Sequence, residues 1–139
     1  MKSENQVVLE FPSRSSNESF ARVAAAGFAM QLDPTLEELG DIKTAVSEAV
    51  TNAIIHGYPD CIGRIVMKLR IREGNVMEII VKDWGVGIAD VEQARKPMFT
   101  TGNDERSGMG FTIMESFMDT IRVKSAPQKG TTVTLKKRI

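Results

Sequence analysis

Apolar residues recur at helical spacing between residues 35 and 57, which predicts a helix with one buried stripe along its length. Thr35 and Glu38 have the spacing of a capping box at its start, and Gly57 is suited to a C-terminal cap. Glu48 and Asn52 lie four residues apart, so they project from the same side of the helix beside the apolar stripe. Taken alone, this pair is either an ordinary solvated face or a functional one.

Two other segments show the same helical period. From Ser15 to about Leu32 a capping-box spacing precedes an apolar stripe of Phe20, Val23, Ala24 and Phe28. The polar side of this helix carries Glu18, Arg22 and Gln31, which form either a water-facing surface or a partner-docking face. A further helix begins at Gly110, with a predicted stripe of Phe111, Met114, Phe117 and Met118.

Alternation of apolar and polar residues predicts strands in the rest of the chain. The expected inward positions are Val7, Leu9 and Phe11; Ile65, Met67, Leu69 and Ile71; Met77, Ile79 and Val81; Ile121 and Val123; and Thr131, Val133 and Leu135. Gly74-Asn75 predicts a tight hairpin between the second and third of these strands. Residues 90–95 are expected to form a short helix.

The alternation that ends at Val81 places Asp83 on the buried face, directly before Trp84-Gly85-Val86-Gly87. A buried carboxylate is unfavourable unless hydrogen-bond donors meet it. Two interpretations are open: an Asx-turn that stabilises the glycine-rich bend, or a carboxylate that binds a ligand. Thr131 is a second polar residue at an inward strand position.

Residues 97–108 are polar, lack a periodic apolar face and lead through Gly108-Met109-Gly110 into a helix. Backbone amides at such a helix entrance are suited to bind phosphate. The chain contains no Gly-x4-Gly-Lys-Ser/Thr and no Gly-x-Gly-x-x-Gly, so P-loop and Rossmann nucleotide sites are excluded.

Length and composition narrow the class of protein. The 139 residues suit a single domain, 1–139, and eighteen basic residues balance eighteen acidic ones, so no global positive field favours nucleic acid or an anionic membrane. We find no apolar run near the roughly 20 residues of a spanning helix and expect a soluble, cytoplasmic protein. Cys61 is expected to be a buried thiol, and the single histidine, His56, excludes a His-rich metal site.

Four features occur in a fixed order: Glu48-x3-Asn52-Ala53, Asp83-x-Gly85-x-Gly87, Gly108-x-Gly110 and Gly130-Thr131. This order resembles the Bergerat-type ATPases of the gyrase, Hsp90, histidine-kinase and MutL superfamily, and the resemblance covers essentially the whole chain. Within that superfamily, residues 47–57 (Ser-Glu-Ala-Val-Thr-Asn-Ala-Ile-Ile-His-Gly) and 106–115 (Arg-Ser-Gly-Met-Gly-Phe-Thr-Ile-Met-Glu) are most similar to the family of anti-sigma F factors of spore-forming bacteria.

The resemblance implies the Bergerat ATP-binding fold, an α/β (α+β) two-layer sandwich whose mixed, mostly antiparallel sheet is covered on one face by helices. It also implies ATP and magnesium (Mg) as cofactors, with Asn52 as the Mg ligand. An inward Asp83 can accept a hydrogen bond from the adenine amino group, which favours ATP over GTP. The implied nucleotide-binding residues are Asn52, Asp83, Gly85, Gly87, Thr100, Thr101, Ser107, Gly108, Met109, Gly110 and Thr131.

By the same resemblance, Glu48 is the general base of a protein serine kinase, and Arg106 is a lid arginine that faces the terminal phosphate and the protein substrate. The implied partners are a sigma factor of the sigma F type, an anti-anti-sigma protein phosphorylated on serine, and a second copy in a homodimer. Arg22 and Arg106 would contact these partners. The alternatives are a sensor histidine-kinase domain, a general-stress anti-sigma kinase and a non-catalytic, ATP-gated binding module.

Overall fold

A computed structural model of the chain describes residues 3–95 and 110–139. These residues form one five-stranded sheet with the strand order β1-β2-β3-β5-β4. The strands are β1 (Ser3–Pro12), β2 (Arg64–Arg72), β3 (Val76–Asp83), β4 (Thr120–Ala126) and β5 (Gly130–Arg138). The helices are α1 (Ser16–Ala29), α2 (Leu36–Asn52), α3 (Val91–Ala94) and α4 (Gly110–Phe117), with a 3-10 turn η1 (Met30–Leu32) after α1 and a π-helical turn η2 (Ala53–Gly57) after α2.

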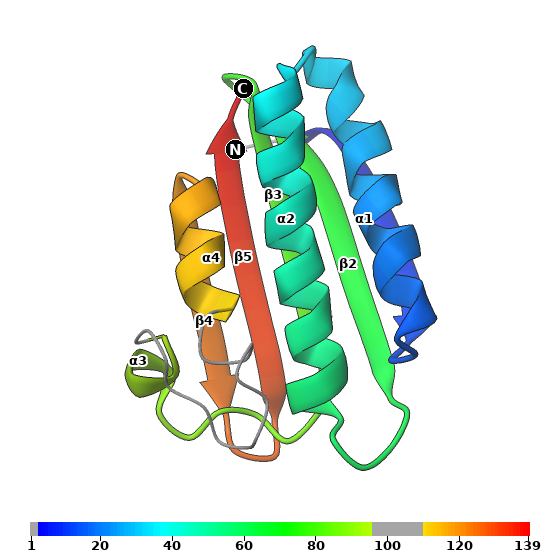
Figure 1. The fold of residues 1–139 in the computed structure, drawn as a ribbon, viewed down its shortest axis with the longest axis vertical. Helices are drawn as coiled ribbons and strands as arrows, with labels where there is room; N and C mark the ends of the chain where they lie inside the picture. Colours follow the sequence, from blue (N-terminus) through cyan, green and yellow to red (C-terminus); the bar gives the residue numbers. More distant parts are fainter. Residues whose placement is uncertain (1–2, 96–109) are drawn as a thin grey trace.

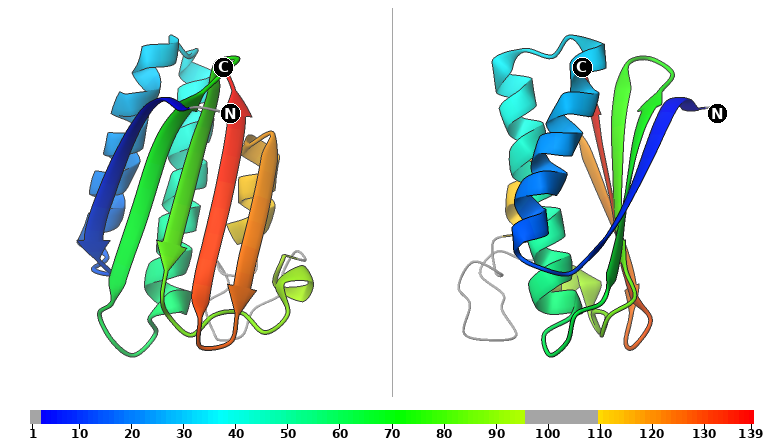
Figure 2. Two further views of the ribbon diagram at one scale, coloured as in Figure 1. Left: turned by 180° about the vertical axis from the view of Figure 1, so that it is seen from behind. Right: turned by 90° about the vertical axis from the view of Figure 1, so that its right-hand side faces the viewer.

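The molecule has two layers. Helices α1, α2 and α4 lie side by side on one face of the sheet (Figure 1), and the other face carries no helix among the described residues (Figure 2). The expected two-layer α+β fold is confirmed. All four strand pairings in the described chain are antiparallel, so the sheet described here is purely antiparallel and not mixed as expected.

The hydrophobic core lies between the sheet and the helices. Side chains at the predicted inward positions of β2 and β3 are almost fully buried, because strand alternation directs every second one toward the helices. The largest buried side chains, such as Met67, Ile79 and Leu135, meet the apolar stripe of α2 at Ile42 and Val46. Burying each of these side chains contributes about 1.5–3 kcal/mol, so α2 is fixed against the centre of the sheet.

Helix α2 begins as the sequence predicts and ends differently. The Glu38 N–H donates to Thr35 Oγ1 at 3.0 Å, and the Thr35 N–H donates to Glu38 Oε1 at 2.9 Å, which completes the capping box. Gly57 was expected to cap the C-terminus, but it is the last residue of η2 and is absent from the residues with positive φ. A π-helical turn takes the place of that cap, a form that often occurs at functional sites.

Helix α1 is rotated relative to its predicted stripe. Its buried residues are Ala21, Ala25, Phe28 and Ala29, whereas Phe20 and Val23 are 60% and 62% exposed. The alanines let α1 approach α2 closely, and this packing outweighs the burial of larger side chains on the neighbouring face. Ser15 makes no side-chain capping bond, so the capping box predicted here is also wrong.

Two other expectations concern the surface. Cys61 is exposed in the loop that joins η2 to β2, so the prediction of a buried thiol is wrong. Connecting loops run over protein surfaces, and residue type alone does not reveal this position. Among residues 3–95 and 110–139, no helix combines the length and apolar character that crossing a bilayer requires.

Candidate functional site

The C-terminal half of α2, the end of β3 and the start of β5 meet at one end of the molecule (Figure 1). Glu48 and Asn52 lie half-buried on α2, one turn apart as predicted. Helix α4 begins beside them: a Cβ added to Gly110 would lie 3.6 Å from Glu48 Oε2. The carboxylate therefore faces the amide-rich start of a helix, where the helix dipole favours negative charge. An anion bound there would lie within reach of Glu48.

Asp83 is the last residue of β3, is 4% exposed and points toward the helical layer, as predicted. The Gly85 N–H donates to Asp83 Oδ1 at 2.9 Å, so the Asx-turn exists. Burial raises the pKa of Asp83, and the backbone N–H groups of Gly85 and Thr131 oppose that rise by donating to the carboxylate. Among the described residues only neutral donors meet this side chain, and no cation there compensates its negative charge.

The glycines after Asp83 are required by close backbone packing. A Cβ at Gly85 would lie 1.8 Å from the Gly57 carbonyl oxygen, and the Val86 N–H donates to that same oxygen at 2.9 Å. Gly87 has φ +76°, and a Cβ there would lie 1.9 Å from the Ala126 carbonyl oxygen. The end of η2, the 84–88 turn and the β4–β5 turn are thereby locked together around Asp83.

Tyr58 supports this site, and sequence reasoning did not find its role. Its hydroxyl donates to the Arg64 carbonyl at 2.6 Å and accepts from the Trp84 N–H at 2.7 Å. Burial raises the pKa of Tyr58, with a further contribution from the nearby Asp83 charge. The Tyr58 hydroxyl thus ties the start of β2 to the turn that follows Asp83. Its contact with Trp84 joins residues 26 positions apart, which no local pattern encodes.

Ser125 completes a polar row across three strands. Thr131 pairs with Asp83 on one side and with Ser125 on the other, and the Thr131 and Ser125 hydroxyls are 2.7 Å apart. Ser125 Oγ also accepts from the Ile88 N–H at 2.7 Å and donates to the Gly130 carbonyl at 2.9 Å. Sequence reasoning missed Ser125, although extending the inward series of Ile121 and Val123 by one step finds it.

The donor set suits a magnesium ion that is shared with phosphates. Residues 3–95 and 110–139 contain no group of three His, Cys, Asp or Glu side chains able to hold a metal by themselves. Magnesium commonly takes one or two protein oxygens and fills its other positions with water and phosphate oxygens. The half-buried amide of Asn52 can supply such an oxygen on the same side of α2 as Glu48.

One predicted site residue, Arg22, lies elsewhere on the described structure. Arg22 lies on α1, which α2 separates from α4, and its Nε is 3.6 Å from Glu18 Oε2. Arg22 therefore belongs to a different surface from Glu48 and Asp83. Six predicted residues lie outside the described ranges: Thr100, Thr101, Arg106, Ser107, Gly108 and Met109.

Comparisons with known proteins agree with this arrangement. The family described as "Histidine kinase-like ATPase domain" matches residues 11–137. The "Anti-sigma F factor" of Geobacillus kaustophilus (strain HTA426) is 60% identical over 136 residues, which cover 97% of this chain and 93% of that protein. The "Anti-sigma F factor" of Bacillus subtilis (strain 168) is 54% identical over 137 residues, with the same coverage of both chains.

Solved structures support the fold. The RsbU and RsbW domains of a Mycobacterium tuberculosis protein match with a TM-score of 0.69 at 19% identity, over 96% of this chain and 32% of that one. A blue-light activated histidine kinase of Erythrobacter litoralis matches with a TM-score of 0.58 at 21% identity, over 76% of this chain and 31% of that one. At these identities the likeness concerns the fold alone. By its sequence matches, this chain belongs to the histidine kinase-like ATPase domain family and, within it, to the anti-sigma F factors.

Proposed function

We propose that this chain, acting as a single domain, inhibits a sigma factor of the sigma F type and phosphorylates a serine of an anti-anti-sigma protein with ATP. The observation that carries the proposal is the placement of Asp83 and the pair Glu48 and Asn52 at one end of the fold. A protein kinase needs one group to bind adenine, one to hold the metal and one to take the proton from the hydroxyl, and these three residues would fill those roles. The names of the anti-sigma F relatives support the choice of partner.

Asp83 would select adenine. Its carboxylate is buried and, within residues 3–95 and 110–139, is met only by neutral backbone donors, so it retains the capacity to accept from an amino group. Guanine presents an oxygen at the corresponding position, and the two acceptors would repel each other. Thr131, held by Ser125, would support the carboxylate or a water molecule beside it.

Asn52 would hold magnesium, and the amides at the start of α4, including that of Gly110, would hold phosphate oxygens. When bound, magnesium neutralises charge on the phosphates. Glu48 would take the proton from the serine hydroxyl while its oxygen bonds to the terminal phosphorus of ATP and the bond to the ADP oxygen breaks. A general base of this kind commonly contributes about 10²- to 10⁴-fold in rate. Arg106 would face the terminal phosphate.

The outer face of α1 would dock the protein partners. Arg22 pairs there with Glu18, and the same helix exposes two apolar side chains, Phe20 and Val23. Arginine beside exposed aromatic and aliphatic groups is the composition typical of protein interfaces. A homodimer would present two such faces. The alternative functions are those of a general-stress anti-sigma kinase and of an ATP-gated binding module without phosphoryl transfer.

The test is transfer of the terminal phosphate from labelled ATP with magnesium to candidate anti-anti-sigma proteins. Glu48→Gln should lower the transfer rate about 10²-fold or more while ATP affinity stays within about twofold. Label on no serine-bearing partner would reject the kinase and leave the ATP-gated module. Loss of ATP binding in Glu48→Gln, with the rate per bound ATP unchanged, would reject the role of Glu48 as base.

A further inference from the structure

The face of the sheet that carries no helix, called here the open face, is strongly basic although the chain has no net charge. Strand alternation and register direct nine of the eighteen basic side chains to this face: four on β2, one on β3 and two each on β4 and β5. Among the side chains described on all five strands, only Glu10 on β1 and Glu78 on β3 bring acidic groups to the open face. Figure 2 shows this face toward the viewer in its left panel.

The two glutamates neutralise only part of this charge. Glu78 lies within 3.6 Å of Arg70, Arg72 and Lys136, and Glu10 lies 3.1 Å from Arg64. Five cations remain, and no carboxylate of the described chain forms an ion pair with any of them. One of the five is Arg138 at the end of β5, and the other four lie next to one another on the face. These four residues, called here the basic belt, are Lys68, Lys82, Arg122 and Lys124.

Register places the basic belt in two adjacent rows that cross the strands. One row runs Val66, Lys82, Thr132 and Lys124, and the next runs Lys68, Ile80, Thr134 and Arg122. Neighbouring strands lie about 4.8 Å apart, so Lys82 and Lys124 start about 10 Å from each other. In the first row the cations alternate with Val66 and Thr132, whereas in the second row Lys68 and Arg122 flank Ile80 and Thr134.

Trp84 lies at the end of this surface and is 42% exposed. The Arg64 guanidinium lies 4.3 Å from its ring centroid, and the Lys82 ammonium lies 5.1 Å from it. An exposed tryptophan between cations, on the same face as the half-buried Ile80, has the composition typical of binding hot spots in protein interfaces.

We propose that the open face is a docking surface for an acidic segment of a partner protein, with the basic belt as its electrostatic contact. Ile80, which is half-buried on this face, fits an apolar side chain of such a segment, and the belt fits its carboxylates. A polyphosphate fits less well, because its affinity depends on a large excess of positive charge and this chain has none. The surface lies on the opposite side of the sheet from Glu48 and Asn52, so it is separate from the proposed nucleotide site.

The probe is a fluorescein-labelled peptide in which Glu and Asp alternate with Leu and Val, followed by anisotropy at low ionic strength. Binding should change the emission of Trp84, which is the only tryptophan of the chain, and should weaken with added salt. Lys68→Glu combined with Lys124→Glu should weaken binding about tenfold or more, because like charges would then face each other.

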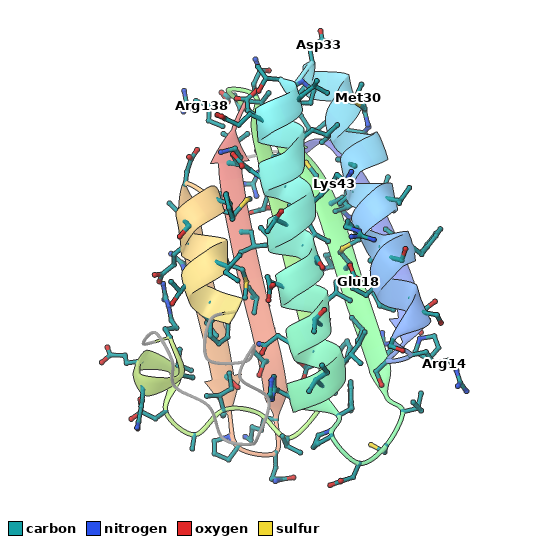
Figure 3. All side chains as sticks on the ribbon, in the orientation of Figure 1. Arg14, Glu18, Met30, Asp33, Lys43 and Arg138 are labelled. Carbon is teal, nitrogen blue, oxygen red and sulfur yellow. The ribbon has the colours of Figure 1, made fainter. Side chains whose placement is uncertain are left out.

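The matched control is Arg14→Glu combined with Lys43→Glu, which changes the net charge equally on the side of the molecule that carries the helices (Figure 3). It should change the affinity by less than about twofold. If the charge-reversed variant does not fold, Lys68→Gln combined with Lys124→Gln replaces it as the test variant and should also weaken binding of the peptide. Equal weakening by both pairs of changes, no binding at low salt, or tighter binding of a single-stranded DNA oligonucleotide than of the peptide would each overturn the proposal.

Discussion

Two buried carboxylates on β3 differ in what meets them. Glu78 and Asp83 are each 4% exposed and lie five residues apart, so strand alternation sends them to opposite faces of the sheet. Burial raises the pKa of Glu78, but the hydrogen bond and charge of Arg72, with Lys136 and Arg70, outweigh burial and leave that pKa below its usual value. Burial raises the pKa of Asp83, and its backbone donors do not reverse the rise.

The difference separates a structural carboxylate from one suited to a ligand. Glu78 is saturated by three cations and holds β2, β3 and β5 together. Asp83 carries a charge that the described chain leaves without a cationic partner, at the end of the fold where η2, β3 and β5 meet. Burial is equal at the two carboxylates and therefore does not distinguish their roles. The charge of the surrounding donors does distinguish them.

The largest expected effect is on stability. Glu78→Gln should lower the free energy of unfolding by about 3 kcal/mol, because it leaves Arg70 and Arg72 crowded at a partly buried position without their anion. Urea denaturation measures this change. Glu10→Gln is the matched control: its ion pair with Arg64 is more than half exposed, and the change should be below about 1 kcal/mol. Equal losses in the two variants would contradict the distinction.

The next effect is on ligand binding. Asp83→Asn should weaken ATP binding about 10- to 100-fold, because it removes a charged acceptor from the proposed adenine site. Titration calorimetry with ATP measures the dissociation constant. Glu78→Gln, if folded under the same conditions, should leave that constant within about twofold. Unchanged ATP affinity in Asp83→Asn would reject base recognition by this carboxylate and favour the Asx-turn as its only role.

A smaller effect is expected at Tyr58. Tyr58→Phe should lower the free energy of unfolding by about 1 kcal/mol, since it removes the hydroxyl that joins Arg64 to Trp84. ATP affinity should fall several-fold, less than in Asp83→Asn, because the turn after Asp83 loses one of its supports. Thermal denaturation and calorimetry measure the two effects. A stability loss with unchanged ATP affinity would restrict Tyr58 to folding.

The smallest effects concern pH, and their signs differ. Glu78 has a folded pKa below its usual 4.5, so its stabilising contribution is present above about pH 4.5 and is lost as the pH falls through the folded value. Asp83 has a folded pKa above its usual 3.8, so its ionised form destabilises the fold at neutral pH, and this penalty disappears as the pH falls toward 3.8. The measurement is the free energy of unfolding of Glu78→Gln and of Asp83→Asn from pH 3 to 7. The difference between each variant and the unaltered chain should change with pH in opposite directions for the two variants. Slopes of the same sign would contradict the assignment.

Much of this fold follows from local pattern. The capping box at Thr35 and Glu38, the alternation along β2 and β3 and the hairpin at Gly74-Asn75 were all predicted and are confirmed. Each depends on residues within a few positions of one another, so short-range hydrogen bonding and burial are sufficient to specify it. The same alternation placed Asp83 and Thr131 inward before any contact between them was known.

The tertiary structure decided what depends on contacts between distant segments. Phe20 and Val23 are exposed because the alanines of α1 pack against α2, and the apolar Leu36 is 89% exposed at the first turn of α2. The places of Tyr58 and Ser125 around Asp83 likewise arise only when η2, β3, β4 and β5 are brought together. A sequence pattern states which side of an element is apolar, but packing between elements determines which side is covered.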